Sequence, residues 1–521
     1  MKLNKLNIVS ALIVSLGLTA CVNDLNVTPI DPNLTTKDAA YNSPLAYKEG
    51  LAKLYAAFTV SGQQGPSGQN DISGIDEGFG TYSRAYWNCQ ELPTDEAVIA
   101  WNDQTVKNFH WQTWSASDVF ITAMYSRAIY TATLCNEYIR VTAGNTDADI
   151  VKYHAEARFL RALAYYHGLD LFGNIPFTTE KDPSATKFFP KQIDRADLFT
   201  YLESELLAIE NDLGAPQFEY GRADQGACWM LLAKLYLNAK VYTGTEKNTE
   251  AITYLNKIIG STYSLATSYK NNFTADNDKS PEMIFPITCD GTYTRSYGGT
   301  TYLIHACLGG SMSESNFGVV GKWGGLRTTS ALSSKFTDLS GNTDSRAMIW
   351  TDGQSEVIND IGTFTDGYGI TKFSNLNSDG SPAIHHSDDF ADTDFPMFRL
   401  ADAYLMYAEA VLRGGSGGSL SQALDYVNAL RERAYGDTSG NITSGDLTLD
   451  FIIDERAREL YFEGHRRTDL IRFGKFTGGD YLWPWKGNVK VGTSTPSYRD
   501  LYPIPSNDLG ANPTLKQNEG Y

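Results

Sequence analysis

The chain is 521 residues long, and its balance of 42% hydrophobic, 20% charged and 12% aromatic residues excludes a protein that is disordered throughout. It carries 61 acidic against 43 basic residues, a formal net charge of -18. An acidic surface repels phosphate backbones and anionic lipid headgroups, so the composition argues against nucleic-acid binding and electrostatic membrane docking. We expect a ligand that is neutral or cationic.

The N-terminus has the pattern of a secretory signal. Lys2 and Lys5 precede an apolar run at 8–18 that is too short to cross a bilayer. The run leads into Leu-Thr-Ala-Cys at 18–21, which resembles a bacterial lipobox. We therefore expect residues 1–20 to be a signal peptide and Cys21 to carry the lipid anchor, with a cleaved soluble product as the alternative. Removing two lysines and no acidic residue changes the net charge from -18 to -20.

Residues 21–37 are polar, contain two prolines and have no hydrophobic period, which predicts a tether between the lipid and the folded part. The other cysteines are odd in number and have no Cys-x-x-Cys spacing, which argues against a disulfide framework and a zinc site. We predict free core thiols at Cys89, Cys135, Cys228, Cys289 and Cys307.

Beyond the tether, the dominant hydrophobic period is that of an amphipathic helix. The segments with this period are 156–172, 198–213, 228–239, 399–413 and 420–434. Only Gly-Gly-Ser-Gly-Gly-Ser separates the last two, so we predict a helical hairpin in which Ala403, Ala408 and Ala423 allow close approach. Such hairpins are the units of tetratricopeptide arrays. The predicted fold is all-α, a scaffold of degenerate tetratricopeptide-like hairpins.

Residues 271–394 differ in composition from the helical segments. Gly, Ser, Thr and Asp surround isolated aromatic residues and short apolar runs. A long segment without helical period inside a compact protein is usually functional. We therefore predict one domain at 38–521: a helical scaffold at 38–270 and 395–475, a loop-rich insertion at 271–394 that carries the ligand site, and an irregular C-terminal segment at 476–521.

Four long motifs, in this order along the chain, resemble the RagB/SusD family of Bacteroidetes lipoproteins. They are E-A-R-F-L-R-A-L-A-Y-Y-H-G-L-D-L-F-G-N-I-P-F at 156–177, F-R-L-A-D-A-Y-L-M-Y-A-E-A at 398–410, R-A-R-E-L-Y-F-E-G-H-R-R-T-D-L-I-R-F-G at 456–474 and the ending Y-P-I-P-S-N-D-L-G-A-N-P-T-L-K-Q-N-E-G-Y at 502–521. The resemblance implies a lipoprotein at the surface of the outer membrane that holds oligosaccharide over a SusC-type TonB-dependent transporter and catalyses no reaction.

Shorter stretches at 87–96, 236–244, 294–303 and 481–487 are similar to the starch-binding member of the family. This similarity implies an α-glucan ligand, with dextran as an alternative. A glucan presents apolar faces and a rim of hydroxyls, so its site needs flat rings and planar hydrogen-bonding groups. One stack covering roughly 60 Å² is worth about 1.5 kcal/mol. Two or three stacks, less the costs of ordering and desolvation, predict millimolar affinity.

The resemblance also implies particular site residues. Tyr297 and Trp323 fall on two positions of the aromatic arc of the starch binder, and Arg84 falls on its hydrogen-bonding arginine. The third aromatic position falls on Ile99, which removes one platform, while Trp101 two residues later is a candidate substitute.

The asparagine that accompanies the arginine in the starch binder falls on Gln104. From the residues alone, Arg84 could instead pair with Asp95 or Glu96. The other tryptophans at 87, 229, 483 and 485 are predicted to be structural.

Paired loop carboxylates offer oxygen ligands for a metal ion. Asp-Asn-Asp at 276–278 and Asp-Thr-Asp at 392–394 alternate acidic residues, a spacing compatible with Ca²⁺ although no EF-hand pattern is present. The resemblance implies a calcium ion here, held by Asp278, Asp392 and Asp394. No other cofactor is expected.

Motifs of common enzymes are absent from the sequence. Gly-x-Ser-x-Gly at 414–418 joins two predicted helices, whereas a nucleophile elbow joins a strand to a helix. The run at 456–472 contains Glu463 and Arg467 four residues apart, which predicts pairing along a helix or with solvent. Two alternatives stay open: a helical glycosidase, which needs only two carboxylates, and a tetratricopeptide scaffold that binds a protein partner.

Overall fold

The computed structural model describes residues 40–183, 188–386 and 389–521. The predicted signal peptide, Cys21 and the tether therefore lie outside the described residues. The chain divides into two units, 1–50 and 51–521, and the second contains all the described helices and strands except the first part of α3 (Pro44–Ala56). Among the described residues, no helix combines the length and apolarity that a membrane span requires.

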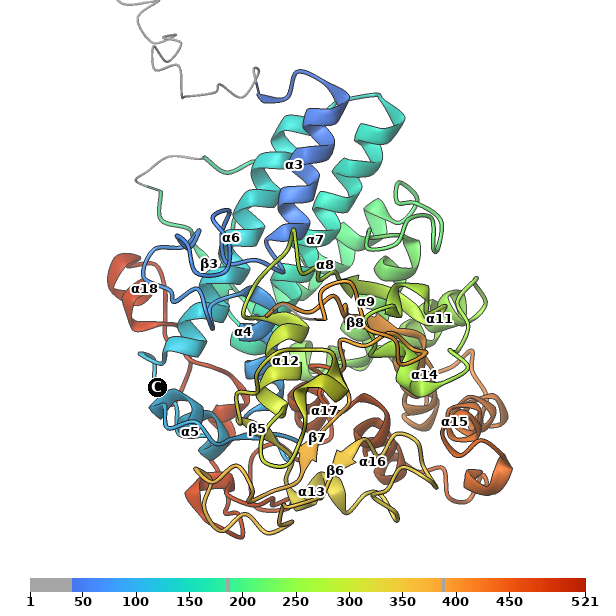
Figure 1. Ribbon diagram of the computed structural model, residues 1–521. Helices are drawn as coiled ribbons and strands as arrows, with labels where there is room; N and C mark the ends of the chain where they lie inside the picture. The colour runs from blue at the N-terminus through green and yellow to red at the C-terminus, as the bar shows by residue number, and fades with distance from the viewer. Residues whose placement is uncertain (1–39, 184–187, 387–388) are drawn as a thin grey trace, which may run out of the picture. The chain divides into compact units, whose positions relative to one another are not determined.

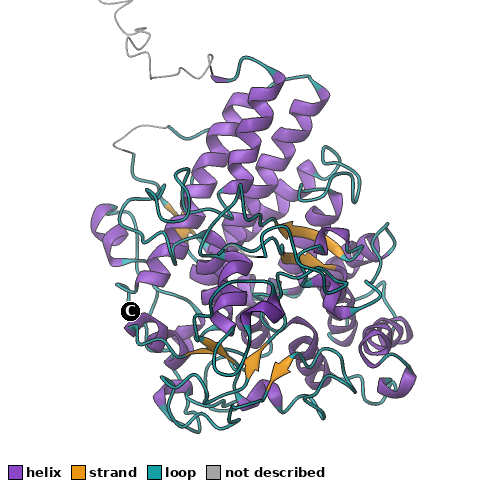
Figure 2. Cartoon of the chain, viewed as in Figure 1, coloured by secondary structure: helices purple, strands orange, loops and turns teal. Residues whose placement is uncertain are grey.

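Helices provide most of the regular structure, and loops connect them at every level (Figure 2). The α-helices are α3 (Pro44–Ala56), α4 (Tyr82–Glu91), α5 (Gln104–Trp111), α6 (Val119–Thr142), α7 (Ala148–Phe172), α8 (Arg195–Ile209), α9 (Gln225–Leu237), α10 (Ala239–Thr243), α11 (Asn248–Ile259), α12 (Gly299–Cys307), α13 (Ser330–Ser333), α14 (Leu400–Leu412), α15 (Leu420–Tyr435), α16 (Leu449–Leu460), α17 (Arg466–Arg472) and α18 (Ser506–Ala511). The prediction of an all-α fold is confirmed.

The strands are short and form antiparallel pairs. They are β1 (Val98–Ile99) with β5 (Leu326–Arg327), β2 (Ile175–Pro176) with β3 (Gln192–Ile193), β4 (Met283–Ile287) with β8 (Phe395–Arg399), and β6 (Ile349–Trp350) with β7 (Gly369–Ile370). None of these pairs forms a separate layer, so the helices carry the core and the strands fix loop positions.

Two hairpins illustrate how the sequence specifies the scaffold. α6 and α7 are joined by a short loop and run side by side (Figure 1). Asp118 and Asp147 cap the two helices by accepting backbone N–H bonds in their first turns. In the predicted hairpin of α14 and α15, Ala403, Ala408 and Ala423 are fully buried, as close approach requires.

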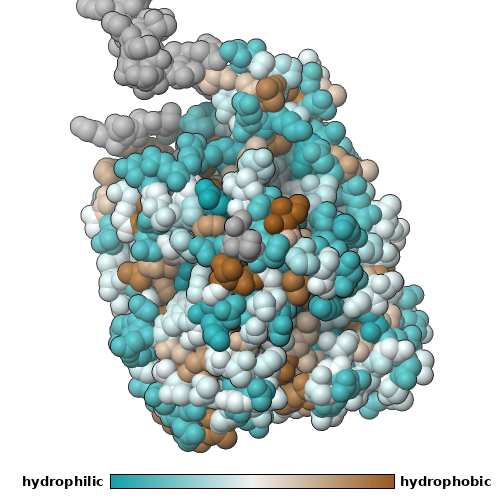
Figure 3. Space-filling model, in the orientation of Figure 1, coloured by the Kyte–Doolittle hydropathy of each residue, from teal (hydrophilic) through white to brown (hydrophobic). Residues whose placement is uncertain are grey.

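The thiols and tryptophans predicted to be structural behave as expected. The five cysteines in the described residues are free, with Cys289 partly exposed and the others buried. Trp87 and Trp483 are 1% exposed. Trp229 and Trp485 are partly exposed, and each donates its indole N–H to an acceptor within the protein. On the face shown in Figure 3, hydrophobic residues are scattered among hydrophilic ones.

The insertion is anchored where its chain enters and leaves. β4 pairs with β8 so that Met283 lies opposite Arg399 and Ile287 opposite Phe395. Between these strands the insertion contains α12, whose nine residues are all buried. The sequence concealed this helix because its nine residues are too few to establish a helical period and include Thr300, Thr301 and His305 among the apolar ones.

The structure contradicts the pairing that was predicted within the charged run at 456–472. Glu463 and Arg467 do not pair along one helix, because Glu463 lies in the turn between α16 and α17, where Phe462 has a φ of 63°. Glu463 is instead fully buried between Arg399 and Lys372, with N–O distances of 2.6 Å to each. Arg467 pairs with Asp170.

Glu463 belongs to a buried network that we call the ion-pair core. Its members are Glu282, Arg346, Lys372, Arg399, Arg433, Glu455, Glu459 and Glu463. Each of these side chains is at most 4% exposed. The network ties α15 and α16 to the strands that close the insertion.

Candidate functional site

Three aromatic side chains, Trp101, Trp323 and Tyr297, lie in a row that we call the aromatic shelf. The ring centroids of Trp101 and Trp323 are 6.4 Å apart, with an interplanar angle of 44°. Those of Trp323 and Tyr297 are 6.2 Å apart, with an angle of 56°. All three side chains are partly exposed. The fold thus gathers three rings from separate segments, close to α12 and β5 (Figure 1).

The β1–β5 ladder places Trp101. Ile99 lies opposite Leu326, and the ladder continues with a 2.9 Å bond from the Ala100 N–H to the Gly325 carbonyl. The indole N–H of Trp101 then donates to the Trp323 carbonyl at 3.2 Å. Any Cβ at Gly325 would lie 2.7 to 2.9 Å from indole atoms of Trp101, so glycine here lets the ring lie against the backbone.

Trp323 is held against the C-terminal end of α12. Its backbone N–H donates to the His305 carbonyl at 2.9 Å. The N–H groups of Gly324 and Gly325 donate to the carbonyls of Leu308 and Ala306, each at 2.8 Å. Gly324 has a φ of 57°, which favours glycine. The His305 ring stacks on the Trp323 ring, with centroids 4.9 Å apart and an angle of 18°. His305 therefore supports one face of the indole.

Arg84 holds the backbone of Tyr297 in position. Arg84 is only 8% exposed, and its Nη1 donates to the carbonyls of Gly78 and Tyr297 at 2.9 Å each. Its Cζ lies 4.1 Å from the ring centroid of Tyr302 and 5.6 Å from that of Trp101. Burial lowers the pKa of Arg84. Arg84 thus supports two shelf residues from below, and its predicted contact with sugar stays a prediction.

Ile99 and Gln104 occupy different surroundings from the shelf rings. Ile99 is 1% exposed within β1, where the strand pairing buries its side chain, and its predicted place in the glycan site stays a prediction. Gln104 is exposed at the start of α5, where its amide donates to the Asn108 side chain at 2.8 Å. Sequence reasoning missed His305 and Tyr302, because nothing in an apolar helix marks which side chains support a distant ring.

Two of the predicted metal residues, Asp392 and Asp394, already accept hydrogen bonds within the protein. Burial, with smaller contributions from the charges of Asp278 and Asp392, raises the pKa of Asp394 to about 7. Asp394 accepts hydrogen bonds from the Tyr220 hydroxyl at 2.6 Å and the Cys289 N–H at 2.7 Å. Negative charge is therefore poorly compensated here, which suits a cation.

A second cluster shares one of these carboxylates. One ligand atom each from Asp290, His385 and Asp392 lies within 4.8 Å of the others. Asp392 hydrogen-bonds His385 and accepts from the Gly291 N–H at 3.0 Å. These contacts hold the loop before Tyr297 to the chain around residue 385.

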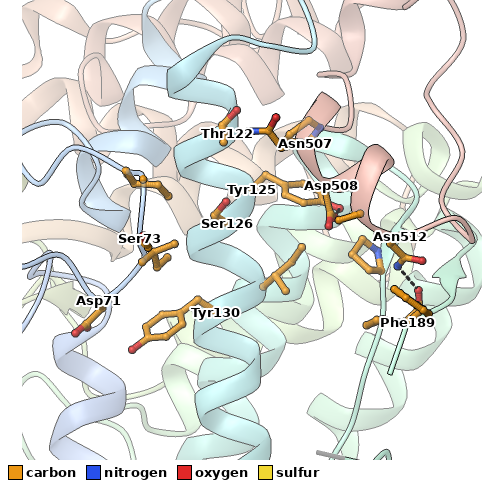
Figure 4. A pocket seen from close by; sticks show the side chains of 18 of the residues that line it. Asp71, Ser73, Thr122, Tyr125, Ser126, Tyr130, Phe189, Asn507, Asp508 and Asn512 are labelled. Atoms are coloured by element: carbon orange, nitrogen blue, oxygen red, sulfur yellow. Dashed lines mark hydrogen bonds between the residues drawn. The ribbon is translucent and has the colours of Figure 1, made fainter. Parts of the chain in front are cut away.

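A cavity of about 750 Å³ lies elsewhere, between α6, α18 and the loops at 71–75 and 188–190 (Figure 4). Tyr125 turns toward Asp508, whose carboxylate accepts from its hydroxyl at 2.5 Å. Tyr125 is only 3% exposed, whereas Phe189 is 51% exposed. Tyr130 and Phe188 at this cavity are also partly exposed. The shelf is the stronger candidate for stacking because its three rings lie in a row, with centroid spacings of 6.4 and 6.2 Å.

Known proteins resemble the chain over nearly its whole length. The SusD family model matches residues 311–521. The starch-binding protein SusD of Bacteroides thetaiotaomicron is 38% identical over 558 aligned positions, covering 98% of this chain and 97% of that protein. SusD-like protein P25 of Formosa agariphila is 26% identical, over 76% of this chain and 78% of that protein.

Solved structures share the fold at lower identity. Surface glycan-binding protein A of Bacteroides thetaiotaomicron, in complex with laminarihexaose, superposes with a TM-score of 0.70 at 19% identity, over 91% of this chain and 99% of that one. A laminarin-binding SusD-like protein gives 0.70 at 22% identity, over 92% and 100%. At such identities the similarity shows a shared fold and does not identify the ligand of this chain. With the 38% identical relative, however, it identifies the chain as a member of the SusD family.

Proposed function

We propose that the protein captures an α-glucan chain on the aromatic shelf and delivers it to a SusC-type TonB-dependent transporter. The observation that carries this proposal is the row of three partly exposed rings at centroid spacings of 6.4 and 6.2 Å. Successive rings are inclined by 44° and 56°, so their faces do not share a plane. A bent chain such as an α-glucan fits tilted platforms better than a flat ribbon does. The name of the 38% identical relative supports starch as the ligand.

The shelf suits a neutral polymer and weak binding. Three stacks of about 1.5 kcal/mol each give about 4 to 5 kcal/mol before ordering and desolvation are subtracted. Affinity for a short oligosaccharide is then near millimolar, and a polymer gains by presenting many binding units. The net charge of -18 disfavours an anionic polysaccharide. Dextran, another neutral α-glucan, is the alternative within this proposal.

Several features of the proposal concern residues and partners outside the described structure. Acylation of Cys21 anchors the protein in the outer membrane with the shelf on the cell surface, above the transporter. The protein acts by binding and hydrolyses nothing. A Cys21→Ala variant should leave the membrane fraction, and continued co-sedimentation with membranes would contradict the anchor.

We also assign a structural Ca²⁺ to the carboxylates of Asp278, Asp392 and Asp394. Oxygen ligands suit Ca²⁺, and a bound cation would lower the raised pKa of Asp394. Added Ca²⁺ should raise the melting temperature of the protein after treatment with chelator and should not do so in Asp394→Asn. Equal melting temperatures with and without Ca²⁺ would remove the ion from the proposal. The glycan site does not depend on this ion.

Electrophoresis through gels containing polysaccharide tests the main proposal. Wild type should be retarded by amylopectin and pullulan, and not by xylan. Trp323→Ala should lose most of the retardation, whereas Trp229→Ala, which removes a partly exposed indole outside the shelf, should keep it. Retardation by dextran alone would select the alternative glucan. No retardation by any polysaccharide would favour a tetratricopeptide scaffold for a protein partner, and sustained release of reducing sugar would favour a glycosidase.

A further inference from the structure

Tyr293 is a large aromatic side chain with almost no packing. It is 87% exposed, although it lies only four residues before Tyr297 of the shelf. The turn beneath it is nevertheless well defined. The Asp290 carboxylate accepts from the N–H groups of Thr292 and Tyr293 at 2.7 Å each. The ring of Tyr293 is therefore held on an ordered turn with its faces accessible to a ligand.

The same turn is anchored from a second side. The Thr292 hydroxyl and the His385 Nε2 form a 2.7 Å hydrogen bond. Gly291 packs so closely on this imidazole that a Cβ there would lie 2.5 to 2.8 Å from its atoms. The position of Tyr293 is therefore fixed by contacts that do not involve its ring.

Tyr293 borders a cavity of about 470 Å³ whose walls carry hydrogen-bonding groups. Gln63 and Gln64 contribute exposed primary amides, and Arg295 contributes an exposed guanidinium. The lining residues, all of them in the described part of the chain, include no carboxylate. A flat ring beside amides and a guanidinium is the combination that sugar hydroxyls and an apolar sugar face require.

Side-chain contacts connect the cavity wall to the shelf. The Arg295 Cζ lies 5.8 Å from the ring centroid of Phe390, and that ring lies 5.3 Å from the ring of Tyr297. Four residues of extended chain reach at most about 14 Å, which bounds the distance between the Cα atoms of Tyr293 and Tyr297. An oligosaccharide that leaves the shelf at Tyr297 therefore reaches Tyr293 within a few sugar units.

We propose that Tyr293, Arg295, Gln63 and Gln64 form a second subsite that binds further units of the same neutral glycan chain. This inference rests on the proposed function of the shelf. The other cation in the cavity, Lys53, pairs with Asp71 at 2.9 Å and is not available for an anionic group. Together with the acidic net charge, this pairing favours a neutral chain over a sulfated or uronic one.

The subsite makes binding depend on chain length. A trisaccharide occupies the shelf alone, whereas a longer chain engages both the shelf and Tyr293. The second contact is intramolecular once the first has formed, so it adds affinity without a second loss of translational freedom. We expect the gain from the Tyr293 stack to be about tenfold at most.

Binding of maltotriose and of amylopectin to the full chain tests this subsite. Tyr293→Ala should weaken amylopectin binding by about five- to tenfold and leave the maltotriose affinity unchanged. Tyr293→Phe keeps the ring and should bind like wild type. Ile384→Ala is the matched control, because it removes an apolar side chain that is 88% exposed. It should have no effect on either ligand.

The outcomes separate the subsite from the shelf. Unchanged amylopectin binding in Tyr293→Ala, or equal losses for both ligands, would overturn the subsite. An effect of Ile384→Ala equal to that of Tyr293→Ala would also overturn it, since generic surface adhesion would then explain both. If the subsite alone is wrong, Trp323→Ala still loses binding. If wild type binds neither ligand, the proposed function itself fails.

Discussion

The ion-pair core buries charged side chains, whereas the aromatic shelf exposes aromatic ones. The core buries charge: Arg399 is fully buried among Glu282, Glu459 and Glu463. The shelf leaves three rings partly exposed and holds them apart with tilted faces. Charge is costly to bury and aromatic surface is costly to expose. Both arrangements therefore need specific support from neighbouring residues.

The kind of support differs between the two regions. In the core, each charge is neutralised by direct partners, so removal of one group leaves others buried without compensation. On the shelf, each ring rests on backbone or on one further side chain, as Trp323 rests on His305 and Trp101 on Gly325. We therefore expect core substitutions to act on stability, and shelf substitutions to act on binding with little change in stability.

Replacement of Arg399 by leucine should give the largest effect. Three carboxylates lose a buried partner, and loss of one member of a buried ion pair costs about 3–5 kcal/mol. Urea denaturation followed by circular dichroism measures the change. If the leucine variant does not fold, Arg399→Lys, which keeps one charge but not the multiple contacts, should fold with intermediate stability.

The matched control for Arg399 is an exposed pair. Lys240 and Glu246 lie 2.7 Å apart and are 66% and 48% exposed, so Lys240→Ala should change stability by less than about 1 kcal/mol. A small effect at Arg399, comparable to that at Lys240, would mean that the core is held by packing rather than by its charges.

A pH effect should follow from Glu96, which lies just before β1. Burial raises its pKa to about 7, although Arg466 opposes the shift. Burial and Glu96 also raise the pKa of Glu91, which binds the N–H groups of Gly464 and His465. The folded state then binds more protons than the unfolded state between the usual glutamate pKa and about 7. Stability should fall as pH rises through this window and stay at its lower value above it.

Glu96→Gln tests this linkage. At about 1.4 kcal/mol per pKa unit, Glu96 accounts for about 3 kcal/mol at most. The variant should lose much of the decline in stability between pH 5 and pH 8, as measured by urea denaturation at each pH. A wild type whose stability is constant across this range would contradict the raised pKa values.

The scaffold was the more predictable part of the fold. Hydrophobic period alone indicated α7, α8, α9, α14 and α15. Of these, α8 and α15 bury one side, whereas α7, α9 and α14 are long apolar helices that are buried over most of their surface. The hydrophobic period missed α12, which has only nine residues. It also misassigned the charged run at 456–472, because spacing within a run cannot reveal a turn or a partner such as Arg399 far away in the sequence.

The shelf was only partly predictable. Tyr297 and Trp323 came from the family resemblance, and Trp101 was a candidate by proximity to Ile99. What the sequence could not supply was the β1–β5 register, which turns Ile99 inward and brings Trp101 onto Gly325. Pairing between distant strands depends on the whole fold, so residues such as His305 that act through it are invisible beforehand.

Gly325→Ala tests whether a shelf substitution acts on binding more than on stability. The added Cβ would lie within 2.9 Å of the indole of Trp101, so the ring must move away and lose its bond to the Trp323 carbonyl. We expect about a tenfold loss of amylopectin affinity, equal to one stack, and a smaller change in stability than at Arg399. Gly510→Ala, where a Cβ meets nothing within 4 Å and φ is not positive, is a matched control for the loss of a glycine. Its binding should equal that of wild type.

His305→Ala should give the smallest effect, a loss of amylopectin affinity of a few fold. The variant keeps the Trp323 ring but removes the imidazole stacked on it, so the indole becomes mobile in the free protein and must lose that freedom on binding. His305→Phe restores a ring and should recover most of the affinity, which a role through hydrogen bonding alone would not allow.

The pH dependence of binding separates these two roles of His305. Burial lowers the pKa of His305, so the neutral ring predominates at neutral pH and above. Protonation of the folded state then requires a pH below the ordinary histidine range, and binding should be constant between pH 6.5 and 8. A fall in affinity centred within that interval would mean that the charge of His305, rather than its stacked ring, controls the shelf.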